Sequence, residues 1–170
     1  MNKIKYCRNC KSPNLEDILN LGNQDMTGIF PQNISSKISS GYLKLARCQN
    51  CSLVQLKHSF DPDEMYGHNY GYRSSLNSSM VSHLNSKSAK LKQRYKLKKN
   101  DIILDIGSND GTFLSSFDKK YCRIGIDPTI SKFKKYYKDK LITLVEDFFN
   151  SKNYYNKFKK KAKLITSLAM

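Results

Sequence analysis

Two Cys-x-x-Cys pairs constrain the N-terminal third of the chain more than any other feature. Cys7 and Cys10 form the first pair, Cys48 and Cys51 form the second, and 37 residues lie between the pairs. Each such turn can present two thiolates to one tetrahedral ion, so two turns predict a closed four-thiolate zinc site that is structural and not catalytic. A redox pair or unligated core cysteines are the alternatives, and His58 or His68 could replace one cysteine as a ligand.

Composition narrows the class of protein. Of the 170 residues, 39% are hydrophobic, which favours a folded chain over a disordered one. No apolar run approaches the roughly 18 residues of a membrane-spanning helix, and the first residues lack the apolar run of a signal peptide. We therefore expect a cytoplasmic protein without membrane contacts, in which reduced cysteines favour metal over disulfides. Cys122, the fifth cysteine, belongs to neither pair.

The charge is strongly positive. Thirty Lys and Arg against 14 Asp and Glu give +16, and 25 of the 30 cations are lysines. This composition favours a solvated surface or a small anionic substrate over nucleic acid, because nucleic-acid readers more often cluster arginines with aromatic platforms.

The chain divides into three segments that differ in composition and residue pattern. Residues 1–62 hold the cysteine pairs on either side of a loop-rich middle. We expect them to form a zinc-binding domain, because a segment with so small a hydrophobic core needs a bound metal to stabilise its fold. Residues 63–99 combine an aromatic run with a predicted helix from Ser74 to Lys96. Residues 100–170 alternate short apolar runs with lysine-rich amphipathic stretches, which predicts an α/β domain built on a parallel sheet.

Four strands are predicted in this last segment, at residues 102–106, 122–126, 141–145 and 162–167, with helices near residues 112–119, 131–138 and 154–160. The first strand runs into Asp105-x-Gly107-x-Asn109-x-Gly111. This spacing lacks the Gly-x-Gly-x-x-Gly of dinucleotide sites, which argues against a nicotinamide cofactor. Asp127 ends the second strand, where a carboxylate can accept hydrogen bonds from ribose hydroxyls, and Asp147 follows the third.

The loop from Asp105 to Gly111 resembles the first motif of class I methyltransferases, with Asn109 where many members have glycine. Together with the cysteine pairs, the run Leu53-Val54-Gln55-Leu56 and the run Tyr70-Gly71-Tyr72-Arg73-Ser74, it is similar to the sugar C-methyltransferase family. The resemblance implies a small four-cysteine zinc-binding domain followed by the first half of a Rossmann-like class I fold.

The same resemblance implies S-adenosylmethionine as cofactor and, in the best-known members, a carbon of a nucleotide-linked keto sugar as methyl acceptor. The cofactor-binding residues it implies are Asp105, Gly107, Asn109, Gly111, Asp127 and Asp147. Removing a proton beside a ketone requires a base, and the enolate oxygen requires a donor. Tyr70, Tyr72 and His68 are the catalytic candidates, with interdomain packing as the alternative for each.

The chain stops at the fourth of the family's seven strands. We therefore expect a truncated protein that depends on the missing strands, with a partner chain as one source of them. The competing functions are a zinc-ribbon module that binds nucleic acid and an inactive remnant.

Overall fold

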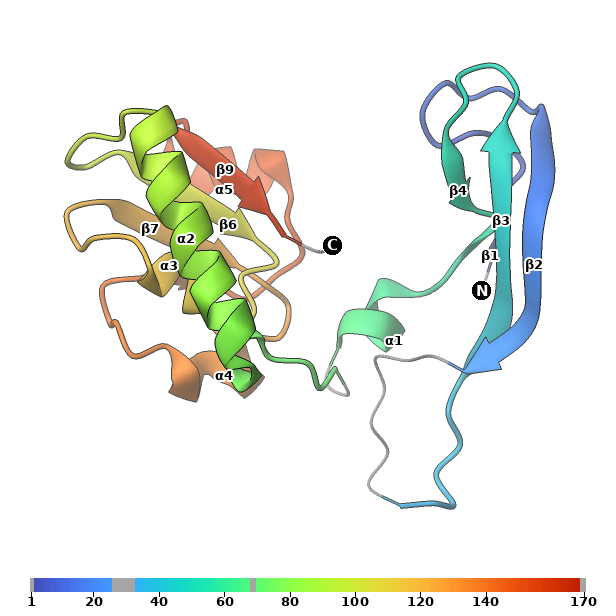
Figure 1. Ribbon diagram of the computed structural model, residues 1–170, viewed down its shortest axis with the longest axis horizontal. Coiled ribbons are helices and arrows are strands. Elements are labelled where there is room, and N and C mark those ends of the chain that lie inside the picture. The colour runs from blue at the N-terminus through green and yellow to red at the C-terminus, as the bar shows by residue number, and fades with distance from the viewer. Residues whose placement is uncertain (1, 26–32, 68–69, 169–170) are drawn as a thin grey trace. The chain divides into compact units, whose positions relative to one another are not determined.

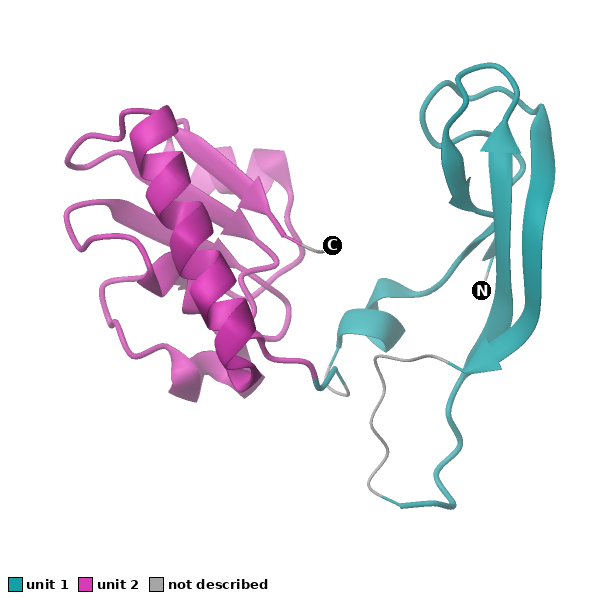
Figure 2. Ribbon diagram, in the orientation of Figure 1, with its two compact units in different colours: residues 1–71 teal, residues 72–170 magenta. Residues whose placement is uncertain are grey.

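The chain folds into two compact units, Met1–Gly71 and Tyr72–Met170, which Figure 2 colours separately. The structure is a computed structural model that describes residues 2–25, 33–67 and 70–168. In this part of the chain, no helix has the length and apolar character needed to cross a membrane. The combination of a four-cysteine module with an α/β unit confirms the predicted fold class.

The first unit is built on antiparallel strands (Figure 1). Strands β2 (Leu15–Asp25), β3 (Ser40–Cys48) and β4 (Val54–Leu56) form one sheet in the order β2-β3-β4. A second sheet pairs β1 (Asn2–Lys3) with β5 (His58–Ser59), and helix α1 (Pro62–Tyr66) follows. The turn between β3 and β4 carries the second cysteine pair.

The β2–β3 hairpin was not predicted, because the sequence favours a loop-rich middle. Its pairing has register irregularities between Asp17 and Leu19 and between Asn20 and Asn23. Each irregularity shifts which side chains face the same way, so the period-2 pattern that identifies a strand is lost. Ile18, Leu19 and Leu21 are each about half exposed, which shows that this hairpin is not organised around a buried apolar face.

The second unit contains the predicted parallel sheet. Strands β6 (Ile102–Ile106), β7 (Cys122–Ile126), β8 (Thr143–Val145) and β9 (Leu164–Ser167) pair in the order β8-β7-β6-β9. The helices are α2 (Ser78–Arg94), α3 (Thr112–Ser115), α4 (Ile130–Phe133) and α5 (Ser151–Phe158), with 3-10 turns η1 (Ser74–Leu76) and η2 (Lys134–Tyr136). This arrangement is a Rossmann-like half fold.

The bounds of β6 and β7 match the prediction, whereas several helices differ. The helix expected from Ser74 begins at Ser78, because the Asn77 side chain accepts a hydrogen bond from the Ser79 N–H and caps it there. The helix expected over residues 112–119 is a single turn, α3. The helix expected over residues 131–138 divides into α4 and η2, a tightening that is common at helix ends.

The sheet of the second unit buries both faces. Neighbouring residues of β6 point to opposite sides, so Ile103 joins one apolar cluster and Leu104 the other. The larger cluster includes Leu84 of α2 and Phe113 and Leu114 of α3, while the smaller includes Tyr154 of α5. Figure 1 shows α2 and α5 on opposite sides of the sheet, which is the layered arrangement that parallel strands require.

A buried ion pair holds the segment that leads into β8. Arg123 of β7 has a side chain only 1% exposed, and its guanidinium lies 2.8 Å from an Asp139 carboxylate oxygen. The same guanidinium donates to the Phe117 carbonyl oxygen at 3.1 Å. The Leu141 N–H and Arg123 both lower the pKa of Asp139, against the opposing effect of burial.

Replacing Asp139 with Asn should lower the free energy of unfolding by about 3 kcal/mol, because it leaves a buried guanidinium without its counter-charge. Urea unfolding followed by helical circular dichroism, which comes mostly from the second unit, measures this loss. Asp118→Asn is the matched control, since Asp118 pairs with Lys92 at the surface and should change stability by less than about 1 kcal/mol. Equal losses in the two variants would contradict the prediction.

Candidate functional site

The four cysteines of the two pairs converge. Their sulfur atoms all lie within 4.8 Å of one another, with Cys7 Sγ 3.6 Å from Cys51 Sγ and Cys10 Sγ 3.5 Å from Cys48 Sγ. A tetrahedral zinc ion with Zn–S bonds of about 2.3 Å separates its sulfur ligands by roughly 3.8 Å. The cluster therefore fits zinc, and within the described residues it contains only the four predicted ligands.

The two cysteine turns share one backbone geometry. In each turn, the N–H of the first cysteine donates to the carbonyl oxygen five residues later, at 2.8 Å from Cys7 and 2.9 Å from Cys48. The residue after the second cysteine, Lys11 or Ser52, has a φ of 62° in both. This left-handed residue reverses the chain, so both thiols of a turn face the same point.

Gln55 supports the zinc centre from β4 and was not among the predicted site residues. Its Nε2 donates to Cys7 Sγ at 3.3 Å, while its Oε1 accepts from the Arg8 N–H at 3.0 Å. Burial opposes the Cys7 thiolate, but hydrogen bonds from the Cys10 backbone and Gln55 lower the pKa of this thiol to about 6. These donors favour the thiolate form that binds metal.

The predicted cofactor loop follows β6 and depends on left-handed residues. Gly107, Asn109 and Gly111 have φ values of 71°, 51° and 74°. A Cβ atom on Gly111 would lie 2.3 Å from the Tyr137 ring, so only glycine fits there. Asn109 tolerates its left-handed angle, as predicted.

Asp127, at the end of β7, lies beside this loop. One of its carboxylate oxygens accepts from the Asn109 N–H at 2.8 Å, and the other accepts from the Thr129 N–H at 2.7 Å. The oxygen bound by Thr129 also accepts from the Thr129 hydroxyl, whereas the oxygen bound by Asn109 accepts one hydrogen bond and can still receive a ligand hydroxyl. Parallel strands thus bring Asp127 to the loop across 18 residues of sequence.

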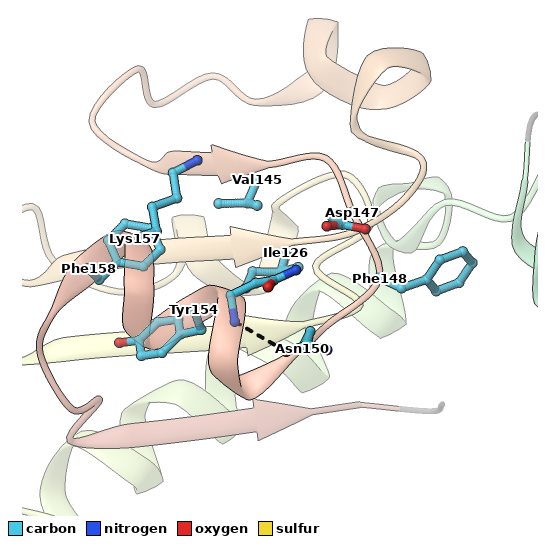
Figure 3. Close-up of a pocket in the computed structure, with 9 residues that line it drawn as sticks. Ile126, Val145, Asp147, Phe148, Asn150, Tyr154, Lys157 and Phe158 are labelled. Atoms are coloured by element: carbon cyan, nitrogen blue, oxygen red, sulfur yellow. Dashed lines mark hydrogen bonds between the residues drawn. The ribbon is translucent and has the colours of Figure 1, made fainter.

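Asp147 lies apart from this hydrogen-bonded group. It follows β8 and lines a hollow with Ile126, Val145 and Tyr154, next to the start of α5 (Figure 3). Phe148 also lines this hollow, although its ring points away from Tyr154. The hollow lies at the carboxyl ends of β7 and β8, the edge where parallel α/β sheets bind ligands.

Tyr137 holds the loop and was not predicted. Its hydroxyl donates to the Asn109 carbonyl oxygen at 2.8 Å and lies 2.9 Å from Ser108 Oγ. Burial raises the pKa of Tyr137, and nearby carboxylates add to the effect despite the Ser108 hydrogen bond. The hydroxyl therefore stays protonated and serves as a permanent donor to the loop. Its position in a lysine-rich stretch gave no signal for this role.

Residues 72–75 are fastened to the same loop. Asn109 Nδ2 donates to the Tyr72 carbonyl oxygen at 3.0 Å, and Asn109 Oδ1 accepts from the Ser74 N–H at 3.0 Å. Asp110 accepts from the Ser75 N–H at 2.9 Å. The candidate Tyr72 is thereby attached to the loop, with a side chain 43% exposed.

The structure does not test the other two catalytic candidates against this loop. Tyr70 belongs to the first unit, where its ring lies 5.6 Å from that of Tyr66. His68 lies outside the described residues. Their roles remain predictions.

Asp105 is buried at the carboxyl end of β6. Thr166, its register partner on β9, donates from Oγ1 to the carboxylate at 2.7 Å. Burial raises the pKa of Asp105 to about 7 and the charge of Asp127 acts in the same direction, while the Thr166 hydrogen bond opposes them. The site therefore holds a carboxyl group that titrates near neutral pH.

Comparison with known proteins agrees with this geometry. Residues 7–66 match the family Methyltransf_13, described as "Putative zinc binding domain". The chain is 27% identical over 128 residues to the C-methyltransferase NovU of Streptomyces niveus. The chain is thus similar to a zinc-binding family in its first unit and to a C-methyltransferase over most of its length. The match covers 74% of this chain and 30% of the relative, so the chain spans less than a third of that protein's length.

Replacing Gln55 with Leu should weaken zinc binding by about 10- to 100-fold, because the Cys7 thiolate loses a buried donor. Competition with a chromogenic chelator measures the affinity. Gln49→Leu is the matched control, since the exposed Gln49 side chain contacts Glu16 and not a cysteine. The prediction is wrong if both variants bind zinc as tightly as the unchanged chain.

Asp105 should make the second unit less stable as pH rises from about 4 to about 7. Its folded pKa is raised, so the folded state binds the proton more tightly than the unfolded state across this window. A shift of about three units corresponds to about 4 kcal/mol. Asp105→Asn should abolish this decline and exceed the unchanged chain in stability near pH 8. Urea unfolding across this pH range tests it, and parallel profiles for the two proteins would refute it.

Proposed function

We propose that this chain contributes the cofactor-binding half of an S-adenosylmethionine-dependent C-methyltransferase. The observation that carries the proposal is the hydrogen bond from the Asn109 N–H to Asp127, which joins the glycine-containing loop of β6 to the acid of β7. A loop of this kind and a carboxylate at the end of the next strand are the two parts that a nucleoside-bearing ligand requires at the edge of a parallel sheet.

In this proposal, the parts of the cofactor divide among the strand ends. Asp105, Gly107, Asn109 and Gly111 hold the amino-acid end, and Asp127 accepts hydrogen bonds from the ribose hydroxyls. Asp147 lies beside the adenine, in keeping with its place at the hollow after β8. When bound, the cofactor supplies an electrophilic methyl group to the acceptor.

The acceptor we propose is a carbon next to a ketone, in a nucleotide-linked keto sugar or a related small anion. Such a carbon becomes nucleophilic only when a base removes its proton and a donor stabilises the enolate oxygen. Tyr72, which lies in the second unit and is attached to the cofactor loop through its carbonyl oxygen, is one candidate, and Tyr70 and His68 are the others. The excess of lysine suits an anionic substrate.

The zinc centre has a structural role in this proposal. Four cysteine sulfurs complete a tetrahedral shell and leave no ligand position for substrate. The centre fixes the turns that support the first unit and takes no part in methyl transfer.

The sheet has an open edge that the proposal must take into account. Among the described residues, β9 pairs with β6 on one side only, and Ile165 of β9 is 57% exposed. Unpaired strand edges of this kind readily accept another strand. We propose that methyl transfer requires strands paired at this edge, whether from the same polypeptide or from a partner chain.

Calorimetric titration of S-adenosylhomocysteine into the zinc-loaded chain tests the cofactor site. We expect binding that Asp127→Ala weakens at least about 10-fold, since the buried carboxylate is the acceptor proposed for the ribose. Asp127→Asn retains one of the two acceptor oxygens and should weaken binding less, and Asp118→Ala removes an exposed acid as the matched control. Well-folded protein that binds no S-adenosylhomocysteine, or that binds it equally after Asp127→Ala, would refute the proposal.

A further inference from the structure

Arg73 has an arrangement that the proposed function leaves unused. Its guanidinium carbon lies 3.6 Å from the centroid of the Tyr136 ring, and its side chain is half-buried. None of the salt bridges among the described residues involves Arg73. A guanidinium stacked on a ring keeps its N–H donors at the edge of the stack, available to a further partner.

The backbone around Arg73 is fixed next to the cofactor loop. The residues on both sides are tied to Asn109, through the Tyr72 carbonyl oxygen and the Ser74 N–H, each at 3.0 Å. The Ser75 N–H adds a third hydrogen bond, to Asp110. With its backbone held here and its side chain held on Tyr136, Arg73 has a defined place beside the loop.

The charges of the loop explain why a cation is needed there. Asp105, Asp110 and Asp127 are 3%, 2% and 6% exposed, and all three raise the pKa of Tyr137 through their charge, after burial as the main cause. Asp105 suits the ammonium group of S-adenosylmethionine, whereas Asp127 is assigned to the ribose and Asp110 already accepts from Ser75 and Thr112. The carboxylate of the same ligand would be repelled unless a cation met it.

We propose that Arg73 binds the carboxylate of the cofactor's methionine end. This inference rests on the proposed cofactor site and identifies the group that receives the one anionic part of that ligand. The planar guanidinium matches a carboxylate with two parallel N–H donors, and stacking on Tyr136 orients it before the ligand arrives. Arg73 and Asp105 thereby meet the two opposite charges of the methionine end, the carboxylate and the ammonium group.

Two ligands that differ by one group test the inference. S-adenosylmethionine and its decarboxylated form share every other atom of the cofactor, so titrating both isolates the carboxylate. We expect Arg73→Gln to weaken S-adenosylmethionine at least about 10-fold and to leave the decarboxylated form within about 2-fold. Arg73→Lys keeps the charge without the fork and should show an intermediate loss.

Lys135→Gln is the matched control, because Lys135 Nζ lies 5.2 Å from the centroid of the same Tyr136 ring. It should change the affinity for neither ligand by more than about 2-fold. Circular dichroism melts confirm that each variant is folded. If Arg73→Gln and Arg73→Lys weaken both ligands equally, or neither ligand, the inference is overturned while binding that depends on Asp127 still supports the cofactor site. If the unchanged chain binds neither ligand, the cofactor site and the inference fall together.

Discussion

The second unit depends on Asn109, the residue at which four of its segments meet. Its N–H donates to Asp127 at the end of β7, its carbonyl oxygen accepts from Tyr137, and its side chain binds residues 72 and 74. A glycine could adopt the same left-handed angle but would lack the amide that makes the last two contacts. Asparagine at this position therefore links the loop after β6 to the segment that precedes α2.

The first unit needs a different source of stability, since it has few apolar side chains to bury. Its fully buried side chains include Cys7 and Cys48, whereas several large apolar residues of β2 remain exposed. Small domains of this kind usually gain stability from a metal or a disulfide. Gln55 and Arg8 support the metal site together, because Gln55 donates to Cys7 Sγ and the Arg8 N–H donates to the Gln55 side chain that makes this contact.

The sequence predicts best where one local pattern decides the structure. The cysteine pairs and strand β6 are examples, because thiolate spacing and a short apolar run each specify their own geometry. It fails where the cause lies far away in the chain. The partner of Gln55 lies 48 residues from it and that of Tyr137 28 residues from it, so neither has a local signature. The β2–β3 hairpin was missed because its irregular register removes the alternation on which strand prediction relies.

The distribution of charge links stability to the proposed function. The chain carries a formal charge of +16, yet the loop after β6 and the end of β7 bury three acids, and burial raises the pKa of Asp105 to about 7. Solubility does not require such a cluster, and Asp105 lowers the stability of the fold where it ionises. A cationic group of a ligand would reverse that effect, because its charge favours the ionised carboxylate. The proposed ligand thus gives Asp105 a role at the ammonium group and Arg73 a role at the carboxylate.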